Sequence, residues 1–212
     1  MKKSILYICL ILFLALFFIT NPQIDVFFSR QFYSINFEHF LCSHQFICLV
    51  IDKFLYLLLL YRYISVLIFY FINIKVFRYK NRFLFFNLGS TVIVQVLLKN
   101  FFGRSRPESI VEFGGIRNFS SAFIISDECF LNCSFISFHV AVATIFFFDV
   151  GDFFRKKNLI FQFVVGFLCI MLYSTIKIFQ GKHFLSDIVV SICFIFIIDS
   201  ILRIWIIKKR DC

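Results

Sequence analysis

The chain has 212 residues, of which 61% are hydrophobic and 16% charged, and its mean hydropathy is +0.91. Soluble globular domains are about half apolar and about a quarter charged, so this chain has too little polar surface to cover a fold in water. With 7 Gly and 2 Pro, collagen-like and proline-rich disordered classes are also excluded. The composition predicts an integral membrane protein.

The formal net charge is +10, and many of the basic residues gather in four short clusters beside long apolar stretches. Such clusters mark the cytoplasmic flanks of membrane spans. No basic face with interleaved aromatic residues remains, so we expect no nucleic-acid partner. The clusters are Lys2 and Lys3; Lys75, Arg78, Lys80 and Arg82; Arg155, Lys156 and Lys157; and Lys208, Lys209 and Arg210.

Six apolar stretches are candidates to cross a bilayer as helices, for which about 20 residues are needed. In chain order they cover about residues 4–20, 46–74 (or 51–74), 83–98, 139–154, 159–178 and 184–207. The first has no small-x-small cleavage site behind it and is predicted to remain as a signal-anchor helix. The basic clusters place both termini in the cytoplasm. The predicted fold class is all-α: a polytopic membrane protein with six transmembrane helices in a single domain, residues 1–212.

Two long segments then lie outside the membrane on the opposite side. Residues 21–45 have a half-apolar pattern that predicts a helix in the headgroup layer, and residues 99–138 are predicted to be loop or short helix. Four cysteines fall in these segments, and an oxidising periplasm permits a disulfide among them. No CxxC pair or His/Cys zinc spacing is present in the sequence, so no metal site is expected. The four are Cys42, Cys48, Cys129 and Cys133.

The first polar cluster, at the outer end of the third predicted helix, contains Lys99, Arg104 and Arg106. A guanidinium binds phosphate through two hydrogen bonds and an ammonium adds a point charge, so the cluster predicts an anion site. The alternative is that these long side chains reach for lipid headgroups at a helix end.

The second cluster, Ser137 and His139, opens the fourth predicted helix. A helix N-terminus favours an anion, which predicts that Ser137 binds substrate there, and a histidine can donate a proton near neutral pH. The alternative is a capping serine and an interfacial histidine.

The third cluster contains Lys177, His183 and Asp187. His183 and Asp187 are spaced i, i+4 and share one helix face, so the carboxylate can fix the imidazole tautomer and leave the other ring nitrogen free to attack. The alternative is a buried polar pair that stabilises a helix. The predicted topology brings all three clusters to one membrane surface, at the outer ends of helices three to six. Together they predict phosphate monoester hydrolysis through a phosphohistidine.

The motifs Lys99-x6-Arg106-Pro107, Ser137-x-His139 and Lys177-x5-His183-x3-Asp187 resemble the three signature motifs of type 2 phosphatidic acid phosphatases, over about residues 83–199. Within that family the surrounding segments are most similar to lipid A 4′-phosphatases. The resemblance implies dephosphorylation of a lipid at the periplasmic face of the inner membrane, without metal or cofactor. It assigns phosphate binding to Lys99, Arg106 and Lys177, the nucleophile to His183, orientation of that ring to Asp187, and the acid for the leaving oxygen to His139.

The sequence departs from the family pattern at three positions: Ile136 and Phe138 replace a proline and a glycine, and Lys177 replaces an arginine. A phenylalanine adds bulk where glycine lets phosphate approach the backbone, and lysine lacks the bidentate fork. These departures leave open a weakly active or inactive member that binds a phosphorylated lipid. A phosphatase of phosphatidic acid, phosphatidylglycerol phosphate or a polyprenyl diphosphate is also open, as is a transporter with an ion path through Asp52 and Lys53. The predicted partners are the lipid substrate and the bilayer, and no protein partner is inferred.

Overall fold

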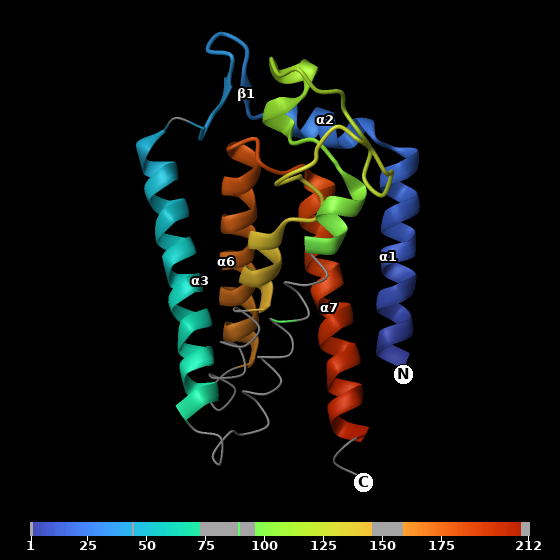
Figure 1. Ribbon diagram of the computed structural model, residues 1–212, viewed down its shortest axis with the longest axis vertical. Coiled ribbons are helices and arrows are strands. Elements are labelled where there is room, and N and C mark those ends of the chain that lie inside the picture. Colours follow the sequence, from blue (N-terminus) through green and yellow to red (C-terminus); the bar gives the residue numbers. More distant parts are fainter. Residues whose placement is uncertain (1, 44, 73–88, 90–95, 146–158, 209–212) are drawn as a thin grey trace.

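The computed structural model describes residues 2–43, 45–72, 89, 96–145 and 159–208. Four long helices, α1, α3, α6 and α7, run along the long axis of the molecule (Figure 1). They coincide with four of the six predicted stretches, and their ends differ from the predicted ends by no more than two residues. Their bounds are Lys2–Thr20, Phe46–Ile72, Leu159–Phe179 and Leu185–Lys208.

The other two predicted spans, 83–98 and 139–154, lie largely outside the described residues. At their outer ends, residues 96–102 and 138–145 are helical. Within the described part of the chain, one stretch, Leu185–Leu202, is long and apolar enough to cross a membrane, and α1 and α2 form a bent apolar pair with a 77° angle at the break. The fold is therefore mostly helical, and the number of six spans stays a prediction.

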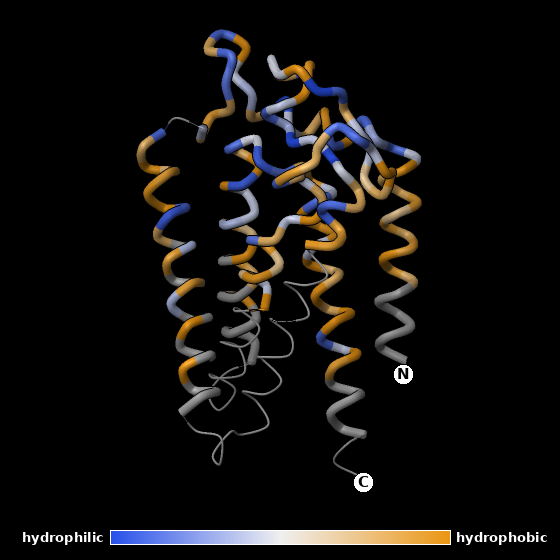
Figure 2. Tube along the Cα trace, in the orientation of Figure 1, coloured by the Kyte–Doolittle hydropathy of each residue, from blue (hydrophilic) through white to orange (hydrophobic). Residues whose placement is uncertain are grey.

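Short elements and loops form a cap, residues 21–43 and 103–137, at one end of the long helices (Figure 1). Hydrophilic residues are concentrated there, whereas the long helices are mainly hydrophobic where they are coloured (Figure 2). The first half of the cap holds α2 (Gln23–Arg30) and a hairpin of β1 (Tyr33–Ser34) and β2 (His39–Phe40). The second half holds two 3₁₀ helices, η1 (Pro107–Ser109) and η2 (Val111–Phe113).

The hairpin departs from the prediction of an all-α fold with a single helix over residues 21–45. The helix occupies only the eight residues of α2. Tyr33 lies directly opposite Phe40 in the antiparallel register, their rings pack edge to face at 5.3 Å, and both contact Phe113. These aromatic contacts between paired strands and a neighbouring loop favour the hairpin over a longer helix.

Both cysteine pairs of the cap are disulfide-bonded. Cys42–Cys48 joins the end of the hairpin to the first turn of α3, and Cys129–Cys133 closes a loop that precedes helical residues 138–145. The bonds agree with the sequence expectation that a disulfide can form among these four cysteines.

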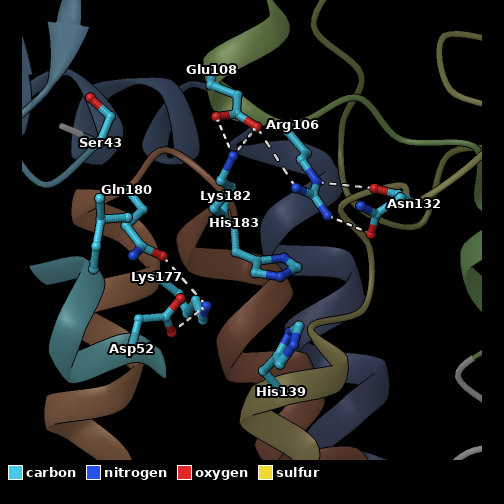
Figure 3. A pocket seen from close by; sticks show the side chains of 11 residues that line it. Ser43, Asp52, Arg106, Glu108, Asn132, His139, Lys177, Gln180, Lys182 and His183 are labelled. Carbon is cyan, nitrogen blue, oxygen red and sulfur yellow. Dashed lines mark hydrogen bonds and ion pairs between the residues drawn. The ribbon is translucent and has the colours of Figure 1, made fainter. Parts of the chain in front are cut away.

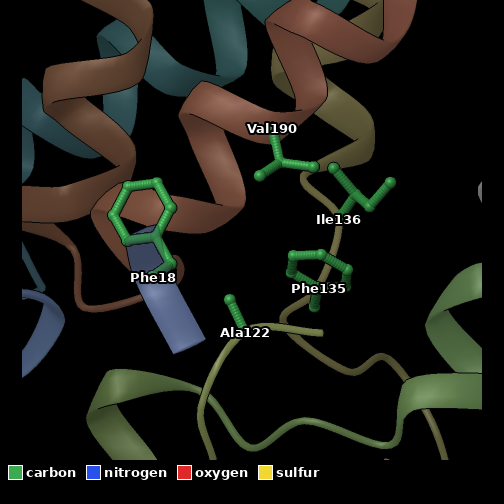
Figure 4. Close-up of a cluster of buried hydrophobic side chains, with 5 residues drawn as sticks. All are labelled: Phe18, Ala122, Phe135, Ile136 and Val190. Atoms are coloured by element: carbon green, nitrogen blue, oxygen red, sulfur yellow. The ribbon is translucent and has the colours of Figure 1, made fainter. Parts of the chain in front are cut away.

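A cluster of five buried side chains packs the cap against the long helices (Figure 4). Phe18 of α1 and Val190 of α7 pack with Ala122, Phe135 and Ile136 of the cap, and each is at most 4% exposed. Burying such apolar side chains contributes about 1.5–3 kcal/mol each for the larger ones. Ile136, which replaces the proline of the family pattern, therefore helps to fix the loop that leads to His139.

Candidate active site

A cavity of about 470 Å³ lies where the cap meets the outer ends of α3 and α6 (Figure 3). Four residues predicted from the sequence, Arg106, His139, Lys177 and His183, line this one cavity, although they come from separate parts of the chain. The remaining lining residues are Ser43, Leu49, Asp52, Glu108, Asn132, Gln180 and Lys182.

A tight turn between α6 and α7 brings His183 to the cavity. Gly181 has a φ of +66°, and its N–H donates to the Ile178 carbonyl at 2.8 Å, which ends α6. A Cβ atom at this position would clash with the Phe40 ring, so the turn requires glycine for both its conformation and its close packing. The turn therefore packs against the hairpin two residues before His183.

The His183 ring is buried and oriented by a backbone carbonyl. Its Nδ1 lies 2.9 Å from the Ser134 carbonyl oxygen, whereas the nearest Asp187 oxygen is 3.8 Å away. A carbonyl oxygen can only accept, so Nδ1 carries the proton and Nε2 keeps its lone pair in the neutral ring. The Ser134 carbonyl thus lies closer to Nδ1 than the Asp187 carboxylate, to which the sequence assigns control of the tautomer.

Asp187 acts on the ring through Ser134. Its Oδ2 accepts hydrogen bonds from the Ser134 hydroxyl and, at 2.8 Å, from the Phe184 N–H, and its Oδ1 accepts from Arg104 at 2.6 Å. The carboxylate is fully buried. The Asp187 carboxylate thus fixes Ser134, and the Ser134 carbonyl in turn orients the His183 ring.

Burial lowers the pKa of His183 to about 4, because the charged imidazolium is poorly solvated there; the nearby Asp187 opposes this shift. The neutral ring, with a free Nε2 lone pair, is therefore the dominant form above about pH 4.

We expect the acid limb of the kcat/KM profile to lie well below the ordinary histidine pKa of about 6.5. If His183 is the nucleophile, as the sequence predicts, activity will be lost as the pH falls through the lowered pKa, because protonation takes up the Nε2 lone pair that attack would use. The measurement is phosphate release in detergent across the acid range. An acid limb that stays near 6.5 would contradict the buried, neutral imidazole.

Each cation that lines the cavity has a protein partner (Figure 3). Arg106 donates to the Asn132 carbonyl at 3.0 Å and to its side-chain oxygen at 2.6 Å. Lys177 pairs with Asp52 of α3 at 2.6 Å, and Lys182 pairs with Glu108 at 2.7 Å. Arg106 and Lys177 therefore approach the two histidines from different sides of the cavity, already held in place.

Lys99 does not line the cavity but lies close to it. It is partly buried near the end of helical residues 96–102, and its charge acts on both His139 and His183. A positive charge at this position favours an anion beside the two rings.

Besides Lys99, two more predicted substrate-binding residues do not line the cavity. Arg104 is 0% exposed, and each of its three guanidinium nitrogens donates to a protein oxygen. This placement disagrees with the phosphate-binding role expected from the sequence. Ser137 is also fully buried; its N–H donates to the Ser191 hydroxyl at 2.8 Å, and its own Oγ is absent from the cavity lining.

Phe138, which replaces a family glycine, is half-buried and packs edge to face with the His139 ring at 5.8 Å. It is absent from the cavity lining, so its bulk supports His139 without narrowing the cavity. Among the described residues, no three His, Cys, Asp or Glu side chains are grouped as a metal site would require.

Sequence reasoning missed several residues that shape the site. Ser134 lies three residues before Ser137 of the second polar cluster, but it contacts His183 through its backbone carbonyl, a group that every residue has. Asp52 was considered only as an ion-path residue, and it pairs with Lys177. Asp25 accepts a hydrogen bond from Arg104 at 2.8 Å, and its position as an acid within an apolar segment is a signal that could have identified it.

The profile of the PAP2 superfamily matches residues 81–211. The lipid A 4′-phosphatase of Francisella tularensis subsp. novicida (strain U112) is 23% identical over 207 residues, which cover 94% of this chain and 93% of that protein. The lipid A 4′-phosphatase of Rhizobium leguminosarum is 33% identical over 103 residues, 48% of this chain and 43% of that protein.

The crystal structure described as that of the first transmembrane PAP2 type phosphatidylglycerolphosphate phosphatase from Bacillus subtilis has the same fold. It aligns with a TM-score of 0.67 over 98% of both chains, at 16% identity. The fold and the sequence match agree with the resemblance inferred from the three motifs. The chain belongs to the PAP2 superfamily.

Proposed function

We propose that the protein hydrolyses a phosphate monoester on a membrane lipid, of which lipid A is the first candidate, through a phosphohistidine at His183. One observation carries the proposal: the Ser134 carbonyl fixes Nδ1 at 2.9 Å, which leaves Nε2 free in a cavity that also contains Arg106, Lys177 and His139. A fixed ring with a free lone pair beside cations and a second histidine is an arrangement suited to phosphoryl transfer.

In the first step Nε2 of His183 attacks phosphorus, and the bond from phosphorus to the lipid oxygen breaks. Protonated His139 gives its proton to that oxygen, so the lipid leaves as an alcohol. In the second step neutral His139 takes a proton from water, whose oxygen attacks the phosphohistidine; phosphate leaves and His183 regains its lone pair. Arg106 and Lys177 stabilise the charge on the equatorial oxygens in both steps.

The choice of lipid A rests on the relatives, since the two described above, from Francisella and Rhizobium, are named lipid A 4′-phosphatases. The cavity supports a phosphate on a polar headgroup, because its mouth holds the pair Lys182–Glu108, with side chains 39% and 34% exposed. A cation and an acid at the mouth can bind hydroxyl groups beside the phosphate.

We place the cavity at the periplasmic face of the inner membrane. Both disulfides lie in or beside the cap, and disulfides persist in oxidising compartments. The basic clusters of the sequence flank the opposite ends of the predicted spans.

A reporter enzyme that needs disulfides to fold will be active when fused near Gly115 of the cap and inactive when fused after Arg78, because only the cap is exported. The measurement is reporter activity in intact cells, normalised to the amount of fusion protein. The reverse pattern would place the cavity in the cytoplasm.

The function is tested with purified protein in detergent, in the presence of a chelator, on four substrates: lipid A, phosphatidic acid, phosphatidylglycerol phosphate and a polyprenyl diphosphate. The proposal expects phosphate release from lipid A at the highest kcat/KM. A higher kcat/KM on one of the other three lipids would support phosphatase activity but identify a different substrate. No release from any of the four would refute the enzymatic proposal.

A further inference from the structure

Arg104 occupies the centre of a buried polar network that joins the cap to the first turn of α7. Its guanidinium donates to Asp187 at 2.6 Å, to Ser186 at 2.7 Å, to Asp25 at 2.8 Å and to the Ser120 carbonyl at 2.7 Å. The Phe184 ring lies against it, with 4.3 Å from the guanidinium carbon to the ring centroid. Each of the three guanidinium nitrogens therefore donates to an oxygen of the protein.

Asp25, the second member of the network, comes from α2, far from Asp187 in the sequence. It is 1% exposed and accepts from the Ser186 N–H at 2.9 Å as well as from the Ser186 hydroxyl. The neighbouring positions Phe27 and Arg30 of α2 are exposed. Helix α2 lies across the top of the molecule (Figure 1) and reaches the first turn of α7 through this carboxylate.

The network has one cation and two carboxylates, none of them accessible to water. Burial opposes the charge on Arg104, but Asp187 and Asp25 hold the pKa of the guanidinium above its ordinary value. Because a buried charge without a partner is strongly unfavourable, each carboxylate is confined to the place where it faces Arg104.

The fixed position of Asp187 also limits the position of His183. The carboxylate oxygen of Asp187 that does not face Arg104 accepts the Ser134 hydroxyl, and the Ser134 carbonyl accepts the His183 Nδ1–H. A chain of direct contacts thus runs from Asp25 through Arg104, Asp187 and Ser134 to His183.

We infer that Arg104 and Asp25 are positioning residues of the reaction, through which α2 holds Asp187, and with it the His183 ring, in the orientation for attack. The inference rests on the proposed function. Neither residue lines the cavity, so both act on the chemical step and leave phosphate binding to other side chains.

The test measures kcat and KM on lipid A for Asp25→Asn, Arg104→Gln and the double variant. Arg104→Gln leaves two buried carboxylates without a cation, and we expect kcat to fall about 100-fold with KM within about threefold. Asp25→Asn keeps the Arg104–Asp187 pair, and we expect its kcat to fall by only about tenfold. The double variant also removes the charge of one of the two carboxylates left without a cation. We expect its kcat to be about tenfold higher than that of Arg104→Gln alone.

The matched control is Asp127→Asn, the same chemical change at an exposed position of the cap, and we expect wild-type kcat. Inorganic phosphate, added to each variant, reports on the cavity by its effect on Tm, which we expect to match that of the wild type. Arg104→Lys is included because it keeps the charge in a smaller side chain that cannot make all four contacts; it is expected to fold and to lose kcat.

Wild-type kcat in Arg104→Lys and Asp25→Asn would overturn the inference, and so would a rise in KM at unchanged kcat. A double variant no better than Arg104→Gln would also overturn it, because the two charges would then not act as one network. If the wild type itself releases no phosphate, the proposed function fails, which is a different outcome from normal turnover in these variants.

Discussion

Replacing His183 with alanine will lower kcat by about 10⁴-fold or more, the scale observed when a covalent nucleophile is removed. The other nucleophilic side chains among the described lining residues are already engaged. His139 is assigned to proton transfer, carboxylates hold the amines of Lys177 and Lys182, and the Ser43 hydroxyl donates to the Phe40 carbonyl. The measurement is phosphate release from the preferred lipid, with expression and Tm checked in parallel.

The matched control is His39→Ala. His39 is a part-buried histidine on β2 of the cap that does not line the cavity, and its replacement is expected to leave kcat within about twofold. Turnover near the wild-type rate in His183→Ala would exclude attack by this ring.

Asp187→Asn will lower kcat by about 10³-fold. The amide keeps the size of the side chain but removes the charge that faces Arg104 at 2.6 Å, and its NH₂ group cannot accept from the donors that now bind the carboxylate. The Ser134 and Phe184 donors then lose a strong acceptor, and the loop that orients His183 loses its anchor. This loss is expected in kcat, with Asp127→Asn as the matched control.

The same variant separates two ways in which Asp187 can act. If the Ser134 carbonyl holds the tautomer, ¹⁵N NMR of labelled histidine will still show the proton on Nδ1 of His183 in Asp187→Asn. A change to the Nε2–H tautomer would instead support direct control by the carboxylate, as the sequence first predicted.

The sequence predicts the long helices well because their signal is local. A run of apolar residues about the width of a bilayer has few ways to fold other than as a helix, and the ends of α6 and α7 fall within one residue of the predicted ends. The hairpin was not predicted, because the contact of Tyr33 and Phe40 with Phe113 joins segments far apart in the chain.

The site was predicted only in part, because its residue types can be read from the sequence but their contacts cannot. Residue type and spacing identify Arg106, Lys177, His139 and His183, which the cavity brings together. They cannot show which cation faces the cavity: Arg104 and Arg106 are two residues apart, yet one is enclosed by carboxylates and the other lines the cavity. Nor can a residue type reveal that a backbone carbonyl, that of Ser134, orients the His183 ring.

The central claim is that phosphate passes through a covalent bond to His183. The direct measurement is rapid acid-free quenching of the protein with lipid radiolabelled in its phosphate, followed by detection of label on the chain. The account predicts label on the wild type that is stable to alkali and labile to acid, that maps to the peptide containing His183, and that is absent from His183→Ala. Turnover without any labelled protein under single-turnover conditions, or label that persists in His183→Ala, would contradict it.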